Sequence, residues 1–141
     1  MGFFDRIFAS SDGYQPLDEN SPAADRIKKI RDQLESLSKQ VHKPLEVVPG
    51  EEDSYVFIGK PPKNFGIAWI EGDKLHSLKS LADEGVKPAQ MQAITDNLRK
   101  IYEANQSNAR FTTKVGNKNI VVTPSEQFRT QVSEVIRQAS H

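Results

Sequence analysis

The chain of 141 residues contains no cysteine, which excludes disulfide bonds, thiolate nucleophiles and cysteine-based zinc sites. No apolar run approaches the roughly 20 residues that a transmembrane helix needs. The N-terminus has no basic region followed by an apolar core, so we expect no secretory signal peptide. The absence of cysteine fits any compartment, whereas the lack of a membrane-spanning run and of a signal peptide predicts a cytoplasmic protein.

Neither sign of charge is in excess, because 19 lysine and arginine residues balance 19 aspartate and glutamate residues. Dedicated nucleic-acid-binding domains usually carry a marked excess of basic residues, so this balance argues against nucleic acid as the partner. The length is that of a single domain with a modest core.

Recognisable catalytic and metal-binding motifs are also missing from the sequence. The three histidines, His42, His76 and His141, have no histidine or cysteine close by in sequence. The segment from Gly59 to Gly66 contains two prolines and no Gly-Lys-Ser or Gly-Lys-Thr, so it is not a phosphate-binding loop. The acidic residues 51–53 lack the pattern of a calcium loop and are interpreted as a solvated turn. We therefore expect a non-enzymatic protein without a metal or cofactor.

Residues 55–70 form the most apolar stretch and contain the only tryptophan, Trp69. Two runs of β-branched and aromatic residues, 55–59 and 65–70, flank two prolines, which predicts a β-hairpin with a wide loop. Side chains alternate along the second strand, with Phe65, Ile67 and Trp69 on one face and Gly66, Ala68 and Ile70 on the other. Both faces are expected to be covered. Trp69 is interpreted as a core residue, with ligand stacking as the alternative.

The first eight residues carry four large apolar side chains at helical spacing: Phe3, Phe4, Ile7 and Phe8. So short a helix needs a surface to pack on, which could be the protein's own domain, a protein partner or a membrane. A single basic residue accompanies them, which is few for a membrane-binding helix. Residues 9–20 lack apolar periodicity, so we expect an appendage and linker over 1–20 and one domain over 21–141.

A helix is predicted from the Ser21-Pro22 start signal to about His42. Its apolar residues follow 3, 4, 3, 4 spacing: Ile27, Ile30, Leu34, Leu37 and Val41. This pattern fits a helix that lies across a sheet. A dimerising coiled coil is the alternative, although two heptads are short for one.

The second half of the chain predicts three more helices and a second hairpin. Asp73 and Gly85 bound a helix that is lined by leucines, and Lys87-Pro88 begins the next. Residues 110–115 and 120–123 flank Gly116-Asn117, which indicates a two-residue hairpin with Val115 opposite Lys118. One face of this hairpin, with Arg110, Thr112, Lys114, Asn119 and Val121, is expected to face solvent. Thr123 to Glu126 resembles a capping box before a C-terminal helix.

Basic residues lie near the tips of both predicted hairpins. We predict that Lys60, Lys63, Arg110, Lys114 and Lys118 form an anion-contact patch if the two tips meet at one edge of the sheet. Solvated lysines at turns are the default interpretation, and the anion-contact patch is the alternative to it.

These patterns predict an α+β fold with two layers, in which an antiparallel sheet of four to five strands packs on helices. The first hypothesis for function is a non-enzymatic adaptor that binds a protein partner or a second copy of itself, with peripheral membrane contact as an alternative. The second is an anion or nucleic-acid binder acting through the hairpin tips. The third is a small-molecule sensor with a pocket near Trp69.

Overall fold

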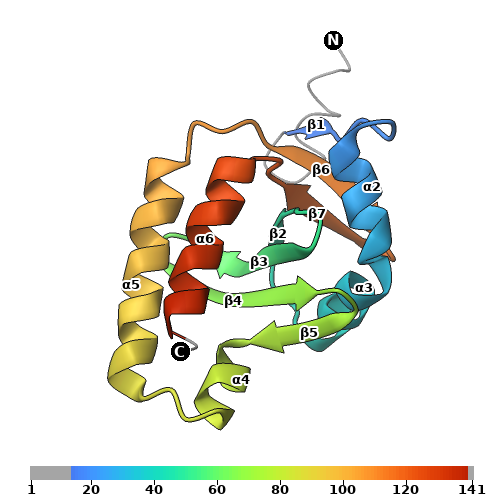
Figure 1. The fold of residues 1–141 in the computed structure, drawn as a ribbon. Coiled ribbons are helices and arrows are strands. Elements are labelled where there is room, and N and C mark those ends of the chain that lie inside the picture. The colour runs from blue at the N-terminus through green and yellow to red at the C-terminus, as the bar shows by residue number, and fades with distance from the viewer. Residues whose placement is uncertain (1–13, 140–141) are drawn as a thin grey trace.

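The hairpin of β3 (Asp53–Lys60) and β4 (Asn64–Glu71) forms the longest strand pair of the sheet. The computed structural model describes residues 14–139, and Figure 1 shows how their elements are arranged. Only residues 61–63 connect the two strands, so the loop is shorter than the sequence suggested. The predicted hairpin is present, and its ladder extends on both strands up to the residues that flank the loop.

The central strand of the sheet is β2 (Leu45–Val48), which pairs antiparallel with β3 and parallel with β7 (Lys118–Val122). The full strand order is β1-β6-β7-β2-β3-β4-β5, with β1 (Gln15–Pro16), β5 (Lys74–Ser77) and β6 (Phe111–Val115) as the other members. The expected α+β class is confirmed. Within residues 14–139 the sheet is mixed and has seven strands, which corrects the expected antiparallel sheet of four to five strands. The sequence did not indicate the two parallel pairs, because they join segments that are far apart along the chain and that no local pattern marks.

Helices cover both faces of this sheet, so the expected two layers are corrected to three (Figure 1). One face carries α2 (Pro22–Lys29) and α3 (Arg31–Gln40). The other carries α4 (Leu78–Asp83), α5 (Pro88–Ala104) and α6 (Glu126–Ala139). The sheet requires this double cover because the alternating side chains of its central strands are apolar on both faces.

The heptad pattern belongs to two helices that meet at Ile30, where the backbone leaves helical geometry. The apolar residues Ile27, Ile30, Leu34 and Leu37 are buried in one cluster with strand residues of the sheet. Packing of a helical segment across a sheet is therefore confirmed. The coiled-coil alternative is wrong for this fold, because the same side chains cannot also face a second chain.

Residues 74–77 form strand β5, which corrects the helix expected to begin at Asp73. Gly72 adopts a φ of 61° in the tight turn that returns the chain beside β4. Leu75 then pairs with Ile70, and the helix begins only at Leu78. Leucines at helical spacing misled the prediction, because the first of them belongs to the edge strand.

The second hairpin has the predicted register, with Val115 opposite Lys118 and Phe111 opposite Val122. The expected solvent-facing side is wrong in part, because Thr112 and Val121 are buried. The capping residue of α6 also differs from the prediction. Ser125 Oγ accepts a hydrogen bond from the backbone N–H of Phe128 at 3.2 Å, whereas the Thr123 hydroxyl turns to the interior.

The segment expected to be a linker contains strand β1. Gln15 and Pro16 pair with Phe111 and Thr112 of β6, and the N–H of Leu17 donates to the carbonyl of Thr112 at 2.8 Å. Leu17 also packs against the core beneath α2 and α3. Residues 14–17 are therefore attached to the sheet.

A buried carboxylate, that of Glu46, lies on the central strand. Its Oε1 accepts a hydrogen bond from the Tyr102 hydroxyl at 2.6 Å, and its Oε2 accepts from Arg110 Nε at 3.0 Å and from the Thr123 hydroxyl at 2.6 Å. The Arg110 guanidinium also lies over the Tyr102 ring. These contacts join β2 to α5 and to both strands of the second hairpin at its open end.

We predict that Arg110→Met lowers the free energy of unfolding by about 3–5 kcal/mol, because it leaves Glu46 buried without a counter-charge. The double variant Glu46→Leu/Arg110→Met should be less destabilised than Arg110→Met alone. Urea unfolding measures the free energy of unfolding of the wild type, of Arg110→Met and of the double variant. Arg31→Met is the control, because Arg31 forms an exposed pair within one helix, which contributes about 0.3–0.5 kcal/mol. A double variant that is no more stable than Arg110→Met would contradict this account.

We also predict that Leu34→Ala lowers the free energy of unfolding by about 2–5 kcal/mol, because Leu34 is fully buried between α3 and the sheet. Ser36→Ala on the exposed side of the same helix should change it by less than about 0.5 kcal/mol. Thermal unfolding at several protein concentrations supplies the check. A melting temperature that rises with concentration in the wild type and not in Leu34→Ala would instead indicate a helix-mediated dimer.

Candidate functional site

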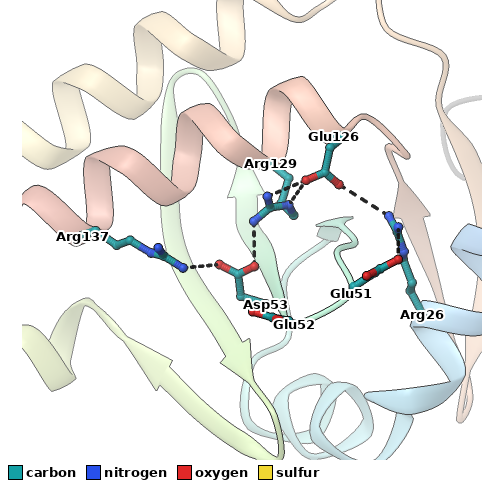
Figure 2. Close-up of a pocket in the computed structure, with 7 residues that line it drawn as sticks. All are labelled: Arg26, Glu51, Glu52, Asp53, Glu126, Arg129 and Arg137. Atoms are coloured by element: carbon teal, nitrogen blue, oxygen red, sulfur yellow. Dashed lines mark hydrogen bonds and ion pairs between the residues drawn. The ribbon is translucent and has the colours of Figure 1, made fainter.

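A row of alternating charges lies where β2 ends and β3 begins (Figure 2). In order, it contains Arg137, Asp53, Arg129, Glu126, Arg26 and Glu51. With Glu52 these residues line a hollow of about 490 Å³, which we call the charged hollow. Arg26 comes from α2 on one face of the sheet and the α6 residues from the other, so the row links the two helical layers.

Asp53 is a buried member of the row and is fixed by three hydrogen bonds. Its carboxylate accepts hydrogen bonds from the Tyr55 hydroxyl at 2.6 Å, from Arg129 Nη1 at 2.7 Å and from the Ser133 hydroxyl at 3.4 Å. Burial and the hydrogen bond to Asp53 raise the pKa of Tyr55 well above its usual value, so the phenol remains a donor at neutral pH. The interpretation of Asp53 as part of a solvated turn is therefore wrong.

Arg129 is anchored on two sides. Its Nε donates to Glu126 Oε2 at 2.8 Å, and its Nη1 reaches Asp53. Hydrogen bonding to Glu126, together with the charges of Asp53 and Glu126, raises the pKa of the Arg129 guanidinium despite the opposing effect of burial. Arg129 thus has little capacity left for a ligand.

A second hollow adjoins the first and has a volume of about 410 Å³. We call it the aromatic hollow, and it is lined by Tyr55, Trp69, Glu71, His76, Leu81, Glu84, Ile136 and Arg137. The His76 ring stacks on Trp69 with centroids 5.8 Å apart, and His76 Nε2 lies 3.9 Å from Glu71 Oε1. Trp69 is only 4% exposed, so its expected place in the core is confirmed, and it also lines this hollow.

Arg137 belongs to both hollows, and its side chain is 67% exposed. Its ion-pair partner among residues 14–139 is Asp53, at 3.7 Å, a carboxylate that Tyr55 and Arg129 already hold at shorter distances. The guanidinium has five N–H donors, so most of its hydrogen-bonding capacity remains for a ligand. Arg137 is therefore the side chain best placed to contact a bound molecule.

The charged hollow lies at the carboxyl ends of the parallel strands β2 and β7. Glu51 and Glu52 follow β2, and Glu126 follows β7 after a three-residue connection. In open α/β sheets, ligands bind at the carboxyl ends of parallel strands, where connections to opposite sides leave a crevice. The hollow shares this location, although only β7 leads to a helix here, whereas β2 continues into the antiparallel strand β3.

The five predicted anion contacts do not form one patch. Lys118 Nζ donates to the carbonyls of Val41 and Lys43, and burial lowers the pKa of its ammonium. The carbonyl of Pro44 accepts from the N–H of Gly59, next to Lys60, so the two hairpin tips flank residues 41–44.

The remaining basic candidates lie elsewhere. Lys63 is in the first hairpin loop, where its carbonyl accepts from Arg99 Nη2 at 3.4 Å. Lys114 lines a separate hollow with Lys28 and Arg31. Arg110 precedes β6, at the end of the hairpin opposite its tip, and its side chain is only 6% exposed because it is bound to Glu46. The N-terminal candidates Phe3, Phe4, Ile7 and Phe8 lie outside the described residues.

Sequence reasoning missed the residues of both hollows apart from Trp69. One signal was available, because Arg129, Ser133 and Arg137 recur every fourth residue and so share one face of α6. The other half of the site, Asp53 and Tyr55, could not be assigned to that face without the sheet topology.

Within residues 14–139, no group of three or more histidine, cysteine, aspartate or glutamate side chains is arranged to hold a metal ion. None of the helices in this range is long and apolar enough to cross a membrane. Comparisons with protein-family models, curated proteins and solved structures find no match. The functional argument therefore depends on the geometry of the hollows.

We predict that two arginines of the same helix, both directed at Asp53, differ sharply in their effect on stability. Arg129→Met should lower the free energy of unfolding by about 2–4 kcal/mol, because it removes the close partner of a buried carboxylate. Arg137→Met should change it by less than about 0.5 kcal/mol, as for other exposed ion pairs. Urea unfolding of both variants gives the comparison. Equal losses would show that Arg137 is structural and not free for a ligand.

Proposed function

We propose that this protein is a non-enzymatic domain that binds a small amino-acid-like zwitterion with an apolar side group at Arg137. The observation that carries this proposal is that Arg137 is exposed, is loosely paired and lies between the charged hollow and the aromatic hollow. This proposal develops the third hypothesis from the sequence, a sensor with a pocket near Trp69.

The charges of the aromatic hollow favour a zwitterion over a simple anion. Arg137 supplies donors for a carboxylate, while Glu71 and Glu84 line the same hollow and can accept hydrogen bonds from an ammonium group. A multiply charged anion such as a nucleotide would meet these two carboxylates and those of the adjoining charged hollow. The lining therefore supports a ligand that carries both signs of charge.

The apolar part of the ligand is expected to contact Trp69, Leu81 and Ile136, which line the aromatic hollow from β4, α4 and α6. His76 stacks on Trp69, which leaves the rest of this lining as the contact surface for an aliphatic group. Ligand sites commonly combine such an apolar lining with a few fixed polar groups.

Binding, and not reaction, is supported by how the polar groups of the charged hollow are engaged. Asp53 accepts from three donors, and Glu126 and Arg129 hold each other. A general base or nucleophile needs a lone pair or proton directed at the substrate, and these groups direct theirs at one another.

We predict that an amino acid with an aliphatic side chain, such as leucine, produces a saturable change in Trp69 fluorescence. The matched amine without the carboxylate and the matched acid without the ammonium should each bind at least about 10-fold more weakly, since a hydrogen bond to a charged group contributes about 1.5–3 kcal/mol. Fluorescence and calorimetry with a panel of amino acids that differ in their side chains would show which side chain binds most tightly.

Arg137→Gln should weaken binding by about 10-fold or more, and Glu84→Gln should weaken binding of the amine-bearing ligands only. Lys100→Gln is the matched control, because Lys100 is exposed on α5 and lines neither hollow. The proposal is wrong if no amino acid of the panel binds, or if Arg137→Gln binds as well as the wild type.

A further inference from the structure

A further concavity, distinct from the aromatic hollow and from the hollow at Lys114, has a largely apolar surface. This apolar groove has a volume of about 410 Å³ and lies among the β1–α2 connection, the start of β6 and the β7–α6 connection. Its apolar lining consists of Leu17, Pro22, Ala23, Phe111 and Pro124, and its rim carries Asp18, Arg26 and Glu126. An open apolar surface of this kind usually binds another apolar group.

The described chain begins at the wall of this groove. Gln15 is paired with Phe111, which lines the groove, and Leu17 lines it two residues later. Thirteen residues precede Tyr14, and they include Phe3, Phe4, Ile7 and Phe8. The six residue steps from Phe8 to Tyr14 span up to about 20 Å, which is more than enough to return to a groove that adjoins β1.

We propose that residues 3–8 dock in this apolar groove of the same molecule through Phe3, Phe4, Ile7 and Phe8. The segment carries one acidic and one basic residue, Asp5 and Arg6, and the groove has both signs of charge on its rim. A segment tethered this closely has a high effective concentration at the groove, which favours it over a separate partner.

Docking would link the N-terminal segment to the charged hollow. Arg26 and Glu126 line both the apolar groove and the charged hollow, where they form an ion pair at 3.7 Å. An occupied groove would hold these two side chains in place at one end of the row of charges.

The test uses the absence of cysteine, which makes one introduced thiol a unique labelling site. Gly2→Cys carries a nitroxide, and the amide signals of Ala23, Phe111 and Glu126 are measured in the full-length protein by NMR. The matched control carries the same label and has serine in place of Phe3, Phe4, Ile7 and Phe8. We expect at least twofold stronger paramagnetic broadening at these three amides in the labelled protein than in this control.

Equal broadening in both proteins would overturn the proposal, because proximity would then come from the tether alone. A mixture of labelled protein without ¹⁵N and unlabelled ¹⁵N-protein separates the remaining cases. Broadening in this mixture as well as in the labelled ¹⁵N-protein would mean that the segment docks on a second copy, and it would also overturn the proposal. Absence of broadening in the mixture, with broadening in the singly labelled protein, supports docking within one molecule.

Discussion

The burial of one carboxylate, that of Glu46 on the central strand, determines how α5 and the β6–β7 hairpin pack against β2. A buried ionised carboxylate is tolerated only where hydrogen bonds and a counter-charge replace the water it has lost. The three groups that do so, from Tyr102, Arg110 and Thr123, come from α5 and from the two strands of the β6–β7 hairpin at its open end. Satisfying Glu46 therefore positions that hairpin against β2, where β7 forms its parallel pair.

Asp53 repeats the same solution at the edge of the fold, with a tyrosine, an arginine and a hydroxyl as its partners. The two clusters differ in their access to solvent. The Arg110 side chain is almost entirely enclosed, whereas the Asp53 cluster opens onto the charged hollow and has a second, exposed arginine beside it. The first arrangement leaves no room for a ligand. The second leaves an exposed guanidinium with one long ion pair at a surface concavity, and this difference is why the proposed function is assigned to Arg137.

Local sequence patterns predicted the elements that local chemistry determines. Gly116-Asn117 fixed the register of the second hairpin, and alternation correctly divided Phe65, Ile67 and Trp69 from Ala68 and Ile70. The failures have a shared physical cause. Glu46, Asp53 and Arg110 are charged and so resemble surface residues in the sequence. Their burial depends on partners that are far away along the chain. Tyr102 is 56 positions from Glu46, and Ser133 is 80 positions from Asp53.

The strict 3, 4 spacing of α2 and α3 shows the same limit from the apolar side. Such a stripe can cover a sheet or a second helix equally well, and its sequence does not distinguish them. The sheet decides between them, because Ala68 and Ile70 present an apolar face opposite the one that α5 and α6 cover, and that face requires a helical layer. Both helical layers are thus used within the molecule. The charged hollow, the aromatic hollow and the apolar groove instead border the end of the sheet where β2 and β7 finish, which neither helical layer covers completely.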